Sequence, residues 1–190
     1  MTRFSWLHLT DLHFGLDGQG PLWPNVKHAF FEDLKKTHDH TGPWNVVLFS
    51  GDFVQQGSKE EFSRLNEEVL HPLWDRMKEL GSEPQLLAVP GNHDLSRPQG
   101  KKSAALKLML QKEGFADIAD DFFTEPVGEY RRVINAAFAN YQEWWGAAPY
   151  RAPGILAGEL TGRFFGITGD RRCSSRRRRF EYDLSAVGGW

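Results

Sequence analysis

The chain has 190 residues, of which 40% are hydrophobic and 25% charged, and its formal net charge is −2. This length suits one domain with a sizeable core, and 14 Phe, 7 Trp and 4 Tyr are too many aromatic residues for a fully disordered chain. The single Cys173 excludes a disulfide framework and a multi-cysteine zinc site. No apolar run approaches the roughly 18 residues of a membrane span, and no signal-peptide pattern precedes the first strand. We therefore expect a cytoplasmic protein with no membrane partner.

The first half of the chain alternates strand and helix signals. Apolar, strand-like segments each end in a polar loop, and the stretches between them have helical periodicity. This alternation predicts an α/β protein with a parallel sheet and right-handed crossovers. We place strands at 4–9, 45–49 and 85–89, and helices at about 22–37 and from 59 to about 80.

Both predicted helices carry local signals that support them. The first has apolar residues at every fourth position, which are Val26, Phe30 and Leu34. At the start of the second, Ser58 and Glu61 have the spacing of a capping box. Pro72 lies inside this second helix, and we expect it to kink or divide the helix.

The second half of the chain has weaker signals. We expect helices near 103–112 and 129–145 and a strand at 163–168. Six arginines then fall within 171–179, a cluster that could neutralise the phosphates of a nucleic acid. Residues 1–170, however, have a net charge of −6, which disfavours a nucleic acid as the partner. We expect one domain over 1–170 and a disordered, solvated tail over 171–190.

Each predicted strand of the first half ends in a loop with chemically reactive side chains. These loops are Thr10-Asp11-Leu12-His13, Ser50-Gly51-Asp52 and Gly91-Asn92-His93-Asp94. The carboxyl ends of parallel strands meet at one edge of a sheet, so we expect the three loops to lie together. Oxygen and imidazole ligands without thiolates suit Mn, Fe, Zn or Mg. A carboxylate such as that of Asp52 can bridge two such ions about 4 Å apart.

In order, spacing and predicted context, these loops resemble the first three motifs of the calcineurin-like metallophosphoesterases, over roughly residues 4–94. Within that family, the first half of the chain resembles the bacterial cyclic-nucleotide phosphodiesterase-like branch more than the protein phosphatases. The resemblance implies an α/β/β/α sandwich, and hydrolysis of a phosphomonoester or phosphodiester substrate by water activated between two divalent ions. The metal ligands that it implies are Asp11 and His13 for the first ion, Asp52 between both ions, and Asn92 for the second.

The resemblance also implies roles for the last two residues of the third motif. His93 would protonate the leaving oxygen, and Asp94 would orient the His93 ring. The family often has a further acidic or polar residue three positions after the bridging aspartate, and here that residue is Gln55.

One departure from the family concerns histidine. All seven histidines lie at or before His93, whereas the family has a further isolated histidine and a Gly-His-x-His motif downstream. We therefore expect the domain to be incomplete at its C-terminal end, with a truncated and weakly active site. The alternative is a non-catalytic, metal-binding remnant or interaction module. Asp170 could offer one more oxygen, whereas the trio His38, Asp39 and His40 is expected in a solvated loop at the opposite edge of the sheet.

Overall fold

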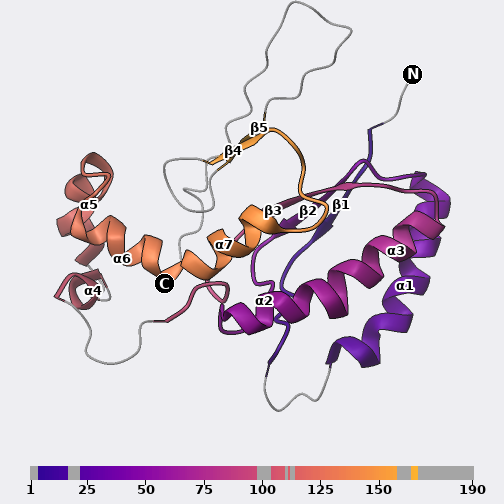
Figure 1. The fold of residues 1–190 in the computed structure, drawn as a ribbon, viewed down its shortest axis with the longest axis horizontal. Helices are drawn as coiled ribbons and strands as arrows, with labels where there is room; N and C mark the ends of the chain where they lie inside the picture. Colours follow the sequence, from indigo (N-terminus) through magenta and orange to yellow (C-terminus); the bar gives the residue numbers. More distant parts are fainter. Residues whose placement is uncertain are drawn as a thin grey trace, which may run out of the picture.

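The chain is described by a computed structural model over residues 4–16, 22–97, 104–109, 111, 114–157 and 164–166 (Figure 1). Three parallel strands form one sheet in the order β1-β2-β3, and a separate antiparallel pair comes later in the chain. The strands are β1 (Trp6–Leu9), β2 (Val46–Ser50), β3 (Gln85–Val89), β4 (Ile155–Ala157) and β5 (Phe164–Gly166). The predicted α/β class, with its parallel sheet, is confirmed.

One face of the parallel sheet forms the centre of the hydrophobic core. In β2 and β3 the inward side chains of Val47, Leu86 and Ala88 are fully buried. The register pairs Leu7 of β1 with Val47, and Val47 with Leu86, so these three side chains share that face. On the opposite face Trp6 is 56% exposed. Leu34 and Met77, from the helices that precede β2 and β3, belong to the same buried cluster as these strand residues.

The first helix, α1 (Leu22–Thr41), is longer than predicted. Trp23 and Leu34 are buried and Phe30 packs against the core, whereas Val26 is 41% exposed, so two of the three residues with the predicted spacing lie on the buried face. The helix ends at Gly42, which has a φ of +76° and donates its amide to the carbonyl of His38 at 2.8 Å.

The residues predicted to form a solvated loop before β2 therefore belong to the last turn of α1. These residues are His38, Asp39 and His40. The ring of His38 lies edge-on to Trp44, with 5.3 Å between the ring centroids. Because α1 leads into the amino end of β2, this turn lies at the edge of the sheet opposite the three motif loops, as expected.

The second predicted helix is a continuous helical segment with a π-helical turn in its middle. It consists of α2 (Lys59–Leu65), η1 (Asn66–Leu70) and α3 (His71–Glu79). The predicted capping box is confirmed, because the Ser58 hydroxyl accepts from the Glu61 amide and a Glu61 carboxylate oxygen accepts from the Ser58 amide. Helix capping thus fixes where the chain turns back after the second motif loop.

Pro72 explains the π-helical turn. Proline has no N–H, so it cannot donate to the carbonyl of Glu68 four residues earlier. That carbonyl instead accepts from the indole Nε1–H of Trp23 in α1, at 2.8 Å. Just before Pro72, the amide of His71 donates five residues back to Asn66, as in a π-bulge. The predicted interruption by Pro72 is confirmed, and the freed carbonyl links this helix to α1.

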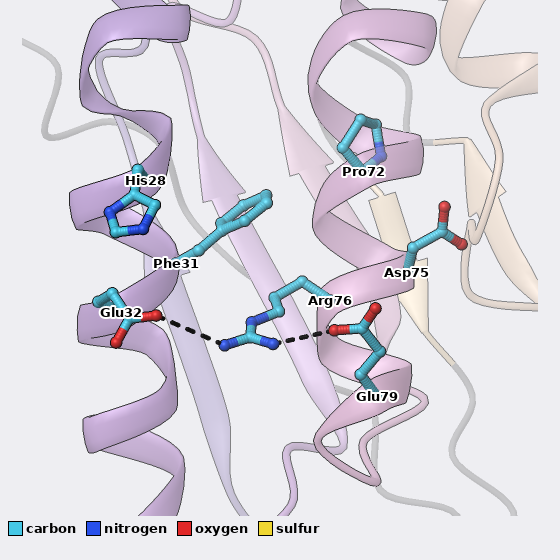
Figure 2. Close-up of a pocket in the computed structure, with 7 residues that line it drawn as sticks. All are labelled: His28, Phe31, Glu32, Pro72, Asp75, Arg76 and Glu79. Carbon is cyan, nitrogen blue, oxygen red and sulfur yellow. Dashed lines mark hydrogen bonds and ion pairs between the residues drawn. The ribbon is translucent and has the colours of Figure 1, made fainter.

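A shallow groove separates α1 from α3 (Figure 2). Arg76 of α3 crosses it and forms ion pairs with Glu32 of α1 at 3.9 Å and with Glu79 at 2.9 Å. His28 and Phe31 of α1 line the other side of the groove. The groove lies between two helices and not at the ends of the strands, so it is separate from the motif loops.

The second half of the chain adds α4 (Ala104–Met109), α5 (Gly114–Thr124), α6 (Glu129–Ala137) and α7 (Ala139–Ala147). The single helix predicted at 129–145 is wrong, since the chain turns at Phe138 and the carbonyl of Ala137 accepts from the amide of Ser96 at 2.8 Å. Helix α5 and strand β4 were not predicted. The strand predicted at 163–168 is described as β5, with three residues.

Helix α7 joins the core formed by the first half of the chain. Its Trp144 stacks on Phe62 of α2, with 5.1 Å between ring centroids, and its Tyr141 hydroxyl donates to the carbonyl of Ala88 in β3 at 2.9 Å. None of the helices in the described part of the chain is both long and apolar enough to cross a bilayer. The arginine cluster at 171–179, Asp170 and the tail predicted at 171–190 lie outside the described residues.

Candidate metal centre

The first two motif loops are joined by a ladder of backbone hydrogen bonds that extends beyond the ends of β1 and β2. The amide of Asp11 donates to the carbonyl of Gly51 at 3.2 Å, and that of His13 donates to Asp52 at 2.9 Å. Phe14 and Val54 then form an isolated parallel bridge. The two loops therefore run side by side, and the predicted meeting of the motif loops at one edge is confirmed for this pair.

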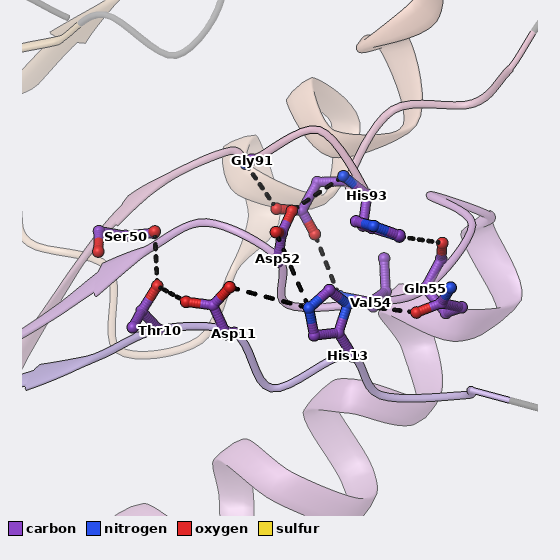
Figure 3. A network of polar contacts seen from close by, with 10 residues as sticks. Thr10, Asp11, His13, Ser50, Asp52, Val54, Gln55, Gly91 and His93 are labelled. Carbon is purple, nitrogen blue, oxygen red and sulfur yellow. Dashed lines mark hydrogen bonds and ion pairs between the residues drawn. The ribbon is translucent and has the colours of Figure 1, made fainter. Parts of the chain in front are cut away.

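Three residues other than glycine in these loops have left-handed backbone conformations. The φ angles are +56° for Asp11, +48° for His13 and +54° for Asp52. For residues other than glycine such conformations cost of order 1–3 kcal/mol each, and they cluster at functional sites. Here they bring the three side chains toward one another, as Figure 3 shows. The strain is thus located at the predicted ligands.

The third motif loop is in direct contact with the second through two glycines. A Cβ atom on Gly91 would lie 2.3 Å from Oδ1 of Asp52 and 2.7 Å from its backbone nitrogen. A Cβ atom on Gly51 would lie 3.0 Å from Cα of Gly91. Gly51 also has a φ of +92°, which side chains rarely adopt. Glycine at both positions lets the backbones approach closely enough to place Asp52 against the third loop.

Two carboxylates face the same nitrogen of His13. Its Nε2 lies 3.8 Å from Oδ1 of Asp11 and 3.9 Å from Oδ2 of Asp52. These distances are too long for direct hydrogen bonds. Two ligand atoms that are each about 2.1 Å from one ion can lie up to about 4.2 Å apart, so His13 is close enough to share an ion with either carboxylate. Asp11 does not belong to the group of three residues whose ligand atoms all lie within 4.8 Å of one another. The donor atoms, two oxygens and one imidazole nitrogen, suit the divalent metals expected from the sequence.

His93 lies at the same centre. Ligand atoms of His13, Asp52 and His93 all lie within 4.8 Å of one another, as a candidate metal-binding group. The His93 amide donates to Oδ1 of Asp52 at 2.9 Å, and the rings of His13 and His93 meet edge to face with 4.6 Å between centroids. The structure therefore brings together side chains from all three motif loops.

Gln55 contacts both histidines, a feature that the sequence did not reveal. Nδ1 of His13 lies 3.2 Å from Oε1 of Gln55, and Nδ1 of His93 lies 3.1 Å from the Gln55 backbone carbonyl oxygen, both within hydrogen-bonding distance (Figure 3). The only available signal was the position of Gln55, three residues after Asp52 in the second motif. Its partners are distant in sequence, so no local pattern predicts these contacts.

Asp94 is completely buried beneath the loops. Its carboxylate accepts from the amide of Gly91 at 2.8 Å and from the amide of Val54 at 3.1 Å. Burial raises the pKa of Asp94 to about 6, although both amide donors favour the charged form and lower it. Asp94 thus ties the third loop to the second, and a role in orienting the His93 ring stays a prediction.

The two remaining predicted residues, Asp11 and Asn92, are exposed at the edge of the site. The carboxylate of Asp11 is oriented by the hydroxyl of Thr10, which donates to its Oδ2 at 2.6 Å. Asn92 occupies the exposed tip of the third loop, between Gly91 and His93. Its assignment to a second ion stays a prediction.

Helix α7 contacts the segments that follow the second and third motif loops. The side-chain amide of Asn140 donates to the carbonyl of Gly57 at 2.8 Å and to the hydroxyl oxygen of Ser96 at 2.7 Å. Ser96 in turn donates its hydroxyl to the same Gly57 carbonyl at 2.7 Å. Gly57 follows the second motif loop and Ser96 follows the third, so one side chain of α7 connects both.

The parallel sheet thus gathers carboxylates and imidazoles at the carboxyl ends of its strands, in a group that could hold a metal ion. The family model for the calcineurin-like phosphoesterases matches residues 4–183, and the chain belongs to that family. Membership implies metal-dependent hydrolysis of phosphate esters, and it confirms the resemblance of the three motifs at the level of the family. A comparison with curated proteins found no match.

Proposed function

We propose that this chain is a phosphoesterase that hydrolyses phosphomonoesters or phosphodiesters with two divalent ions at the loops after β1, β2 and β3. The observation that carries the proposal is the placement of His13 Nε2 opposite oxygens of Asp11 and Asp52, at 3.8 and 3.9 Å. Family membership supplies the reaction class. The resemblance of the motifs to the bacterial cyclic-nucleotide branch favours a phosphodiester, acted on in the cytoplasm.

In this proposal Asp11 and His13 hold the first ion, and Asn92 belongs to the second. Asp52 is suited to a place between the ions because its two carboxylate oxygens have different surroundings. Oδ2 faces Nε2 of His13, whereas Oδ1 accepts from the His93 amide in the third loop. When bound, the ions neutralise the charge of the phosphate and activate a water molecule for attack.

His93 is the proposed general acid. Its Nδ1–H is engaged by the carbonyl of Gln55, which leaves Nε2 as the ring atom free to face the substrate. In the protonated ring, Nε2–H donates its proton to the departing oxygen of the ester, a role suited to an imidazole near neutral pH. Asp94 supports this orientation indirectly, because it holds the amide of Val54 next to Gln55 and that of Gly91 in the loop of His93.

The test measures hydrolysis of bis(p-nitrophenyl) phosphate by the manganese-loaded chain and by His93→Ala. Loss of a general acid typically lowers the rate by about 10²- to 10⁴-fold. His40→Ala is the matched control, because His40 is exposed in the last turn of α1 at the opposite edge of the sheet. We expect the parent chain and the control to have equal activity and His93→Ala to lose it.

Turnover at background level in the parent chain would contradict catalysis. Elemental analysis of the metal content then tests the alternative function, because a non-catalytic metal-binding module would still retain metal. Two ions per chain support the dimetal arrangement, and a single ion would contradict the role given to Asn92.

A further inference from the structure

We propose that Gln55 is a positioning residue whose side-chain carbonyl selects the Nδ1–H tautomer of His13 and thereby presents Nε2 as a metal ligand. The inference deepens the proposed function and rests on it, since it concerns how the chain prepares one ligand of the first ion. No motif of the sequence assigns this role to Gln55.

A neutral imidazole has one protonated and one unprotonated nitrogen, and only the unprotonated nitrogen can bind a metal ion. In this site Nε2 of His13 is the nitrogen that faces Asp11 and Asp52. A tautomer with the proton on Nε2 would direct an N–H at the ion and abolish this ligand. The position of one proton on His13 therefore decides whether the site is ready to bind metal.

Different groups around His13 favour the two tautomers. The carboxylates of Asp11 and Asp52 would stabilise a proton on Nε2, but they lie 3.8 and 3.9 Å away, beyond hydrogen-bonding distance. Oε1 of Gln55 lies 3.2 Å from Nδ1, within that distance. The Gln55 oxygen is therefore the acceptor with the better geometry, and it fixes the proton on Nδ1. The same bond fixes the rotation of the ring.

Gln55 holds His93 by a different atom. Its backbone carbonyl accepts from Nδ1–H of His93 at 3.1 Å, so this bond does not depend on the side chain of residue 55. The contrast gives an internal control. A substitution of Gln55 removes the acceptor of His13 and leaves the acceptor of His93 in place.

The first measurement is the tautomer of each histidine in the metal-free chain, read from long-range ¹H–¹⁵N correlations at pH about 8, above the usual histidine pKa. We expect both His13 and His93 to carry their proton on Nδ1. In Gln55→Met, which keeps the length of the side chain but lacks the carbonyl, we expect His13 to lose this preference and His93 to keep it. Gln55→Glu retains an acceptor and should restore the preference of His13.

The second measurement is the affinity for Mn²⁺ by titration calorimetry. Partners that orient a metal-bound histidine contribute about 10- to 100-fold in affinity, and Gln55→Met should lose that factor. Gln55→Glu should bind at least as tightly as the parent chain. Gln56→Met is the matched control, because Gln56 is the exposed neighbour and its side chain lies outside the site. We expect its affinity to be unchanged.

A proton on Nε2 of His13 in the parent chain would overturn the inference, whether or not any variant folds. Equal Mn²⁺ affinities for Gln55→Met and Gln56→Met would overturn it as well. If the parent chain bound no Mn²⁺, the proposed function would fail, while the tautomer of His13 would still decide the role of Gln55.

Discussion

Gly91→Ala should disrupt the candidate metal centre through the backbone. The added Cβ would lie 2.3 Å from Oδ1 of Asp52, where ordinary contacts begin at 3.4 Å, so this oxygen must retreat by about 1 Å. A change of rotamer cannot relieve the clash completely, because the Cβ would also lie 2.7 Å from the backbone nitrogen of Asp52. Overpacking of this kind costs typically about 1–3 kcal/mol in the free energy of unfolding.

The functional cost should be comparable in free energy to the loss of stability, since each tenfold loss corresponds to about 1.4 kcal/mol. Asp52 is the proposed bridging ligand, and displacement of a functional group by about 1 Å can reduce catalysis by about 10²-fold. Urea denaturation followed by tryptophan fluorescence measures the stability, and titration calorimetry with Mn²⁺ measures the affinity. Gly146→Ala is the control, since nothing lies within 4 Å of a Cβ at Gly146 in α7. We expect Gly146→Ala to be as stable as the parent chain or slightly more so.

One result would refute this reasoning. If Gly91→Ala had the Mn²⁺ affinity and the urea midpoint of Gly146→Ala, the second and third loops could not be in the close contact that the structure gives them. A loss of stability without a loss of affinity would instead show that Asp52 can move without consequence for the metal.

Two further predictions concern the helices that position the loops. Tyr141→Phe removes the hydrogen bond to Ala88 and should cost about 1 kcal/mol in urea unfolding at neutral pH. Burial raises the pKa of Tyr141 well above its usual value, so above pH about 10 the unfolded chain loses a proton that the folded chain keeps. The advantage of the parent chain should therefore fall by up to about 1.4 kcal/mol per pH unit, and a difference that stays constant with pH would contradict this. Ser58→Ala removes the capping box of α2 and should cost about 0.5–2 kcal/mol, whereas the exposed Ser63→Ala in the same helix should cost nothing. If Ser58→Ala and Ser63→Ala lost the same free energy of unfolding in thermal denaturation, the cap would contribute no stability.

The sequence predicted the features that depend on local pattern. The apolar runs located β2 and β3, the capping box located the start of α2, and Pro72 indicated the interruption of that helix. The convergence of the three motif loops also followed, because parallel strands with crossover helices leave little choice about where their ends lie.

The features that the sequence did not predict depend on partners far away in the chain. Helix α6 ends where Ala137 accepts from Ser96, and no periodicity within 129–145 shows that bond. Val26 has the same spacing as Phe30 and Leu34, which pack at the core, but it is 41% exposed, and the spacing alone does not show this difference. The contacts of Gln55 similarly depend on how three loops fold together.

Asn140 couples helix α7 to the motif loops. This residue of α7 connects the segments that follow the second and third motif loops, at Gly57 and Ser96. Coupling between two sites is reciprocal. A metal ion that holds the loops together should therefore also restrain α7, and a change that loosens α7 should weaken binding of the ion at the loops. We therefore expect amide hydrogen exchange in α7 to slow when a metal ion binds at the motif loops.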